Sequence, residues 1–401
     1  MKRTTTLIAL VFAVGCIAAA PVSATGTQEQ GTGKATSSPP AGIAELIASG
    51  EPVPGVARFA QGFSAVRNGD LTVLTVHRPW QNATQSDELT YVLYPRDQEA
   101  PQLAGAHQVV PVPITSIVTM STTFLAHLQL LGELDALVAV DSVSFAYNDQ
   151  VHQRFRDGNL EEVGSGPNVD VERLLTLDPD VVMVNSYGGD WDAQPALEEA
   201  GLPAVVSGDW VENDPLGRAE WMLFTAFFFN ELDHATEHFA EIEAEYRRLV
   251  TLAADADEQP RVLINAPYQG TWSVAGGESY AAEFIRDAGG AYVWADDETP
   301  GAIFLDIESV YAEAGDADIW INPGTWTSLE QGASEDERFT SFRAFETGRV
   351  YNNNRRMGPG GGNDYFESGA VNPHIVLNDL IWAFHPELVP NYEPFYYQRL
   401  D

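Results

Sequence analysis

Short apolar runs alternate with segments of helical periodicity along residues 107–213. The runs are rich in β-branched residues and stand at 115–119, 137–141, 181–185 and 204–207. Strands separated by helices in this way are typical of a parallel sheet covered by helices. Similar runs return at 262–266, 319–322 and 350–352. The pattern therefore predicts two α/β lobes, over residues 107–213 and 258–401.

The stretch between these lobes has a different period. Apolar residues recur there at steps of three and four, at Leu232, Ala235, Phe239, Ile242, Tyr246 and Leu249. No proline or glycine interrupts them, which predicts an amphipathic helix. Asp214-Pro215 is a suitable start and Asp257 to Pro260 a suitable end. We expect a single long bridging helix over residues 214–257.

The region before the first lobe is less regular. Two alternating apolar runs, 71–77 and 89–94, flank a polar stretch, so residues 58–106 are expected to form a β-hairpin preamble. Residues 25–41 are polar and rich in Gly, Ser, Thr and Pro, and we expect a flexible linker over 25–57.

The first residues have the pattern of an export signal. Lys2 and Arg3 precede an apolar run from Leu7 to Ala20, which is short for a membrane span. Residues 1–24 then form a signal peptide, or a lipoprotein signal ends before Cys16, which would carry the lipid. Either alternative predicts an exported protein, periplasmic or at the cell surface.

Charge narrows the functional classes. The chain of 401 residues has 58 acidic and 21 basic side chains and a net charge of −37. Such a surface repels phosphate backbones, so a nucleic-acid partner is not expected. Only Lys2 and Lys34 are lysines, and this balance suits concentrated salt, which screens self-repulsion. We expect a halophilic source and a monomer. Cys16 is the only cysteine, so intramolecular disulfides and cysteine-rich metal clusters are excluded.

The two lobes contain a short internal sequence repeat. Residues 170–175 (DVERLL) lead to a buried run at 180–184, and residues 306–311 (DIESVY) lead to another at 318–321. Each copy consists of an acidic helix start, a helix and a strand.

Several segments, taken in order along the chain, resemble the sequences of solute-binding proteins of ABC importers for iron chelates and cobalamin. They are residues 115–141, 169–175 before 178–182, the bridging helix, 208–210 (GDW), 276–280 (GGESY), 287–290 (DAGG) and 384–388 (FHPEL). The resemblance covers residues 58–401.

This resemblance implies an α/β fold with two Rossmann-like lobes, mainly parallel sheets and a single long bridging helix. It implies capture of a ferric siderophore, another iron chelate or cobalamin in the interlobe cleft, without enzymatic chemistry or a resident cofactor. Delivery would be to an ABC permease and its ATPase in the inner membrane. By position in the repeated phrase, Glu172 and Glu308 would dock onto permease arginines, although both could be helix-start acids that favour the macrodipole. A binding lobe that feeds a receptor is a further alternative.

Ligands of open α/β sheets bind beyond the carboxyl ends of the strands. Hydroxyl, aromatic and cationic residues follow the predicted strands, and we expect ligand contacts from Ser121, Thr122, Ser186, Tyr187, Trp210, Tyr268, Trp272, Trp326, Arg355 and Arg356. Aromatic groups offer stiff contact area and cations fix orientation. The arginines would suit an anionic ferric chelate, whereas a corrinoid would not need them; pairing with surface carboxylates is their alternative.

Two motifs invite other interpretations. His234-x-x-Glu237-His238 matches an inverted zinc-protease motif, with two imidazoles one helical turn apart. A zinc metallopeptidase is therefore the alternative function, although His234 should face away from the apolar stripe and a dedicated metal site is not expected. The run Gly358 to Gly362 lacks a phosphate-binding lysine, so we interpret it as a mobile loop at the cleft edge.

Overall fold

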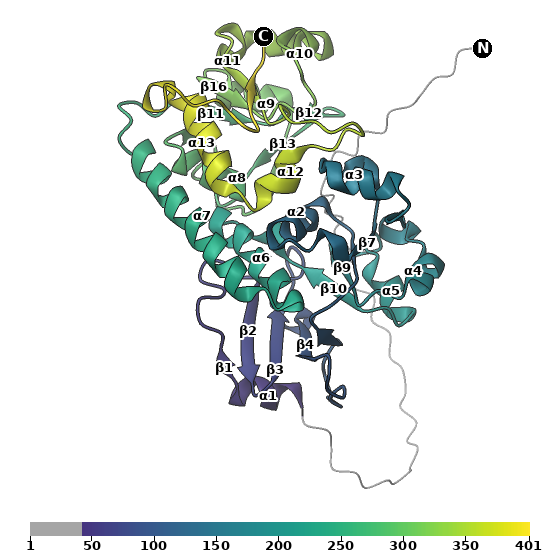
Figure 1. Ribbon diagram of the computed structural model, residues 1–401. Helices are drawn as coiled ribbons and strands as arrows, with labels where there is room; N and C mark the ends of the chain where they lie inside the picture. The colour runs from purple at the N-terminus through teal and green to yellow at the C-terminus, as the bar shows by residue number, and fades with distance from the viewer. Residues whose placement is uncertain (1–41) are drawn as a thin grey trace, which may run out of the picture.

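The computed structural model describes residues 42–401 (Figure 1). Cys16, both cleavage alternatives and most of the predicted linker lie outside the described residues. The N-terminal sheet, the N lobe and the C lobe succeed one another from the bottom to the top of Figure 1, with helices along one side. Within residues 42–401, no helix is long and apolar enough to cross a bilayer.

The N-terminal region forms a five-stranded sheet rather than a hairpin. Its elements are α1 (Ile43–Ser49), β1 (Glu51–Pro52), β2 (Phe63–Asn68), β3 (Leu71–Val76), β4 (Leu89–Pro95) and β5 (Gln108–Val112). The strands lie in chain order, and only the β4–β5 pair is parallel. Two boundaries were therefore wrong. Residues 42–57 contain a helix and an edge strand instead of a linker, and the sheet continues past residue 107.

The N lobe has the predicted parallel sheet. Its strands, in the order β10-β9-β6-β7-β8, are β6 (Ile117–Thr119), β7 (Leu137–Val140), β8 (Glu161–Glu162), β9 (Val181–Asn185) and β10 (Ala204–Ser207). All pairs are parallel. Its helices are α2 (Thr122–Leu131), α3 (Asp149–Arg156), α4 (Val171–Leu177) and α5 (Gln194–Glu199).

The C lobe repeats this plan with an additional small sheet. The larger sheet, in the order β14-β11-β16-β17-β18, contains β11 (Arg261–Ile264), β14 (Ala291–Tyr292), β16 (Ile319–Ile321), β17 (Val350–Asn352) and an antiparallel edge strand, β18 (Gln398–Arg399). The smaller sheet contains β12 (Pro267–Tyr268), β13 (Thr271–Ala275) and β15 (Ala302–Leu305). The helices are α8 (Tyr280–Asp287), α9 (Ile307–Ala314), α10 (Leu329–Glu335), α11 (Arg343–Glu346), α12 (Asp364–Glu367) and α13 (Pro373–Phe384). The seven predicted strands of the two lobes are confirmed.

The segment between the lobes consists of two helices, so the single helix predicted over 214–257 was wrong. Helix α6 (Pro215–Phe229) ends at Asn230, whose φ of 61° is left-handed, and α7 (Leu232–Ala253) follows. Asparagine tolerates this conformation at a helix end. The apolar stripe belongs to α7 alone, because all of α6 except Arg218 is buried. Helix α7 contacts both α6 and α13 and so still links the lobes (Figure 1).

The internal sequence repeat corresponds to one capped helix in each lobe. Asp170 accepts the Arg173 N–H at the start of α4, and Asp306 accepts the Ser309 N–H at the start of α9. Each carboxylate satisfies a free donor of the first turn.

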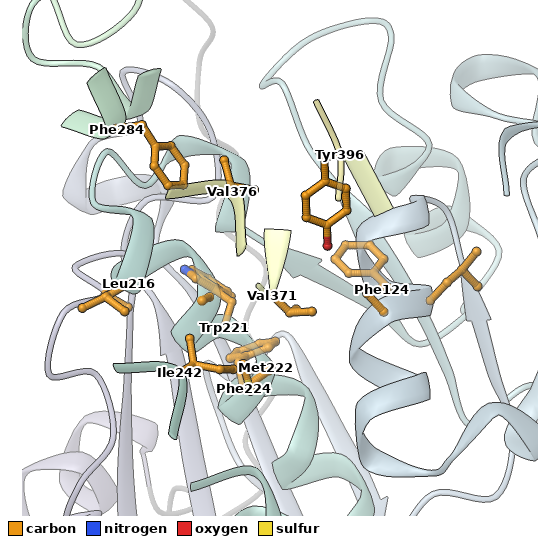
Figure 2. Packing of buried hydrophobic residues seen from close by; sticks show 14 of the residues in the cluster. Phe124, Leu216, Trp221, Met222, Phe224, Ile242, Phe284, Val371, Val376 and Tyr396 are labelled. Carbon is orange, nitrogen blue, oxygen red and sulfur yellow. The ribbon is translucent and has the colours of Figure 1, made fainter. Parts of the chain in front are cut away.

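One hydrophobic core runs through both lobes. Figure 2 shows Trp221 and Phe224 of α6 in the same cluster as Val371 and Val376 of the C lobe and Phe124 of the N lobe. These side chains are at most 2% exposed. Since protein interiors are closely packed, a core shared in this way resists large movement of one lobe against the other.

A buried carboxylate joins the N-terminal sheet to the lobes. Glu220 of α6 is fully buried and accepts the backbone N–H groups of Arg58, Phe59 and Ala60, each at 2.8 Å. Burial raises the pKa of Glu220, and these bonds oppose that rise. The segment that leads into β2 is thereby fixed to α6.

Candidate ligand-binding cleft

Loops at the carboxyl ends of the strands of both lobes meet at one end of the gap between them. A Cβ placed on Gly360 would lie 2.6 Å from the Ser144 carbonyl oxygen, and one on Gly362 would lie 2.3 Å from that of Phe145. Only glycine permits so close an approach of two backbones. The glycine-rich loop therefore lies at the cleft edge, as predicted, and is packed against the N lobe.

A cavity of about 390 Å³ lies beside this contact and is lined by both lobes. Within it, Arg356 bonds Asp364 at 2.5 Å, and its guanidinium lies 4.0 Å from the Phe395 ring centroid and 4.9 Å from that of Tyr147. A cation paired with a carboxylate and held between two rings has little capacity left for an anionic ligand. Arg356 thus lies between the lobes as predicted, but its charge is already neutralised.

The other predicted arginine faces outward. Arg355 pairs with Glu393 at 2.6 Å, and the side chain of that glutamate is 83% exposed. The alternative of pairing with a surface carboxylate therefore describes Arg355, whereas Arg356 pairs with the buried Asp364.

A third arginine, which the sequence reading missed, lies at the junction of the lobes. Arg218 is the one residue of α6 that is not fully buried, with a side chain 22% exposed. Its guanidinium lies over the ring of Tyr280 in the C lobe, 5.0 Å from the centroid. Its Nε has no hydrogen-bond partner and lies 3.9 Å from Asp209 Oδ2.

Two further polar atoms nearby are buried without a partner. They are Thr119 Oγ1, at the end of β6, and Trp210 Nε1, which follows β10. Buried polar groups are almost always hydrogen-bonded. The unpartnered atoms at the carboxyl ends of two strands are therefore available to water or to a polar molecule that binds there.

Trp210 is paired with Tyr187, whose ring centroid lies 5.1 Å away. Tyr187 is 44% exposed, and partial desolvation together with Asp192, Asp209 and Asp141 raises the pKa of its hydroxyl to about 12. Asp192 also bonds the hydroxyl of the buried Ser186 and the N–H of Tyr187. This bonding fixes the loop that presents the Tyr187 ring.

Exposed aromatic side chains occur in both lobes, in the loop after β9 and on the small sheet. Tyr187 and Trp191 follow β9 of the N lobe, and Trp191 is 77% exposed. Tyr268 and Phe304, on the small sheet of the C lobe, are 47% and 48% exposed. The sequence reading included Tyr187 and Tyr268 and missed Trp191 and Phe304. Such rings offer apolar contact area to a ligand.

The N-terminal sheet contributes to the same region. The Trp80 ring lies against Gly188, where an added Cβ would be 2.7 Å from it, and Gln81 lies beside Gly301 of the C lobe. Both residues belong to the loop between β3 and β4, which therefore reaches the cleft loops of the N lobe and the rim of the C lobe.

Two predicted ligand contacts belong to the hydrophobic core instead. Trp272 and Trp326 are 0% and 1% exposed, and their indole N–H groups bond Ile264 O and Glu335. Both rings pack against Trp320. The prediction that they contact a ligand was wrong, because an aromatic residue after a strand can turn into the core as readily as out of it.

The remaining predicted contacts lie at the start of α2. Ser121 is the N-cap residue and bonds Thr123 Oγ1 at 3.0 Å, and Thr122 begins the helix. Both are half-buried. Their position follows β6, beside the unpartnered Thr119 hydroxyl.

The two predicted docking acids have matched positions. Glu172 is the second residue of α4 and Glu308 the second of α9, and both are exposed. Glu308 pairs with Arg338 at 2.7 Å. One turn further on, each helix exposes an apolar side chain: Leu175 is 53% and Tyr311 47% exposed.

The zinc-protease motif does not assemble a catalytic centre. His234 and His238 lie on α7 with their Nε2 atoms 3.1 Å apart, away from the buried Ala235 and Phe239 as expected. No group of three or more His, Cys, Asp or Glu side chains in residues 42–401 is arranged to hold a metal ion.

Two α/β lobes, with the carboxyl ends of their strands facing a gap between them, are the architecture of a two-lobe solute-binding protein. The family model described as periplasmic binding protein matches residues 117–355. The chain belongs to this family, whose members bind solutes and are not enzymes.

A curated relative is an uncharacterized lipoprotein of Methanocaldococcus jannaschii. It is 26% identical over 297 residues, which cover 71% of this chain and 69% of the relative. A second uncharacterized lipoprotein of that organism is 26% identical over 318 residues, which cover 74% of this chain and 76% of that relative.

Solved structures share the fold. A periplasmic heme-binding protein from Pseudomonas aeruginosa has a TM-score of 0.52 at 17% identity and covers 72% of this chain and 98% of its own. The vitamin B12 binding protein of Vibrio cholerae has a TM-score of 0.50 at 14% identity, covering 70% and 99%. A protein of an Fe³⁺-hydroxamate transport system from Saccharomonospora viridis has a TM-score of 0.52 at 17% identity, covering 68% and 94%.

Proposed function

We propose that this protein captures a bulky metal chelate in the interlobe cleft and delivers it to an ABC permease and its ATPase. The observation that carries the proposal is the set of exposed rings and unpartnered polar atoms beyond the carboxyl ends of the strands. Flat apolar contact area with a few polar groups suits a large organic chelate better than a sugar or an amino acid. Proteins of similar fold include ones named for binding heme and vitamin B12.

Charge favours a neutral or cationic chelate, such as a corrinoid or a ferric hydroxamate, over a polyanionic one. Arg355 and Arg356 are paired within the C lobe, while desolvation and the negative charges of Asp192, Asp209 and Asp141 raise the pKa of the Tyr187 hydroxyl. Arg218 is the cation best placed to bond a single acidic or amide oxygen of the ligand.

Titration with cyanocobalamin, a ferric hydroxamate and a ferric catecholate, followed by tryptophan quenching in molar KCl, tests this choice. Nine tryptophans, including the exposed Trp191, provide the signal. We expect saturable quenching by a neutral chelate and at least tenfold weaker binding of the catecholate. Tight binding of the catecholate alone would refute the charge argument, and absence of binding by all three would refute the ligand class.

We further propose that Glu172 and Glu308 dock onto cations of the permease. Their support is the matched position on α4 and α9 and the exposed Leu175 and Tyr311 beside them. Exposed ion pairs orient a complex and contribute little affinity, so the apolar neighbours would supply contact area that salt does not weaken.

Anchoring through Cys16 completes the proposal. The lipoproteins of Methanocaldococcus jannaschii that resemble this chain support it. Mass spectrometry of the exported protein would reveal a lipid on an N-terminal Cys16, and Cys16→Ser should release the protein from membranes. A mature chain that begins after residue 24 would contradict anchoring.

A further inference from the structure

The histidine pair of α7 lies outside the ligand cleft and is not explained by solute binding. His234 and His238 are one helical turn apart, and their ring centroids are separated by 4.8 Å. The side chain of His234 is 42% exposed and that of His238 is half-buried. Side chains four residues apart share one face of a helix, so both imidazoles are accessible from the same side.

The spacing of the two ring nitrogens fits bidentate coordination. The Nε2 atoms lie 3.1 Å apart and share a hydrogen bond, which a metal ion bound by both nitrogens would replace. Metal–nitrogen bonds of about 2.0–2.1 Å to nitrogens at that separation enclose an angle of about 98°. This value lies between the roughly 90° of square-planar or octahedral centres and the roughly 109° of tetrahedral ones. Small rotations of the two imidazole rings would therefore allow any of these coordination geometries.

The surroundings of the histidine pair favour a cation. Glu231 Oε2 lies 3.8 Å from His234 Nδ1, the side of the ring that faces away from His238. A carboxylate on the second nitrogen orients a ligating histidine and strengthens it as a donor. Local negative charge raises the concentration of divalent cations at the pair.

We propose that His234 and His238 bind one divalent transition-metal ion of borderline softness, such as Zn²⁺ or Ni²⁺, through their Nε2 atoms. Water completes the coordination, since residues 42–401 offer no third protein ligand in a preformed group. The ion would cross-link the first two turns of α7, close to the helix break at Asn230. This site is separate from the chelate cleft and does not depend on the proposed function.

Calorimetric titration of the metal-free protein with ZnCl₂ tests the proposal, with thermal unfolding as a second readout. We expect one ion per chain with micromolar affinity and a higher melting temperature in excess Zn²⁺, because an ion that binds the folded state stabilises it. His234→Ala and His238→Ala should each weaken binding at least tenfold and abolish the shift in melting temperature.

A matched control keeps two imidazoles on the same helix at the wrong spacing. In the double variant His234→Ala/Ala240→His, histidines stand at i and i+2, which do not face each other, and Ala240 is exposed. This variant should behave like His234→Ala. Wild-type affinity in the control or in either single variant, or no binding by the wild type at millimolar Zn²⁺, would overturn the proposal. Because all variants retain the other histidines and Cys16, binding elsewhere cancels in the comparison.

Discussion

The backbone N–H of Tyr147 in the N lobe donates to Glu367 Oε2 in the C lobe at 2.7 Å. Glu367 is 2% exposed, and burial, with Asp364 nearby, raises the pKa of its carboxyl to about 7. The two lobes are therefore joined by a hydrogen bond whose acceptor changes charge near neutral pH.

Glu367 should make stability depend on pH. Its folded-state pKa lies above that of an unfolded glutamate, so the folded protein holds an extra proton between about pH 4.5 and 7. The resulting contribution to the free energy of unfolding is fully present at or below about pH 4.5. It is lost as pH rises through about 7, and the loss is at most about 3 kcal/mol.

The variant Glu367→Gln tests this expectation, because it keeps an acceptor for Tyr147 and removes the charge. It should unfold at a higher denaturant concentration than the wild type at pH 8 and at the same concentration at pH 4.5. Denaturation from pH 4.5 to 8 in molar KCl measures this, with the exposed Glu330→Gln as control. Parallel curves for wild type and Glu367→Gln would contradict it.

Arg218 should contribute more to chelate affinity than the arginines chosen from the sequence. Hydrogen bonds to charged groups contribute about 1.5–3 kcal/mol, so Arg218→Gln should weaken binding of the preferred chelate at least tenfold. Arg355→Gln removes a cation already paired with Glu393 and should change affinity less than twofold. Fluorescence titration measures both, and circular dichroism checks that each variant is folded. Equal affinities of wild type and Arg218→Gln would exclude Arg218 from the site.

The two docking acids should differ in their response to mutation. Glu308 already pairs with Arg338, so Arg338→Gln should free it and increase stimulation of the transporter ATPase. Glu172→Gln should reduce that stimulation by up to about fivefold, since exposed ion pairs contribute up to about 1 kcal/mol. The assay uses the permease and ATPase in vesicles at low salt. Glu330→Gln, another exposed acid in the first turn of a helix, is the control. Equal effects of Glu172→Gln and Glu330→Gln would refute docking at α4.

Stability should rise steeply with salt. At a net charge of −37, raising KCl from 0.1 to 2 M shortens the screening length from about 10 Å to below about 3 Å and should raise the melting temperature by roughly 10 °C or more. Sucrose controls for general solute exclusion. An unchanged melting temperature in KCl would argue against the expected halophilic source.

The sequence predicted the parallel sheets well and the connections poorly. Residues 181–184 of β9 are all apolar because both faces of a parallel sheet are covered, and this signal is local. The turn at Asn230 carries a weaker signal, since α6 and α7 are both helical and a single asparagine, which can also lie inside a helix, marks the break. The two-residue strand β1 is too short to have a pattern of its own.

Site residues were harder to predict than strands. Tyr187 and Trp272 each occur near the end of a strand, yet one side chain is exposed and the other is part of the core. Arg218 lies within a buried helix, where no strand end marks it. What distinguishes these residues is the direction of each side chain in the assembled fold, which a linear pattern does not contain.

The loop that carries Trp80 and Gln81 brings the N-terminal sheet to the rims of both lobes. If the proposed cleft binds a chelate, part of its wall therefore comes from outside the two lobes. Swapping the lobes of a shorter relative into this chain would therefore transplant only part of its recognition surface. Evolution of a new cargo preference could proceed in this hairpin loop while both sheets stay unchanged.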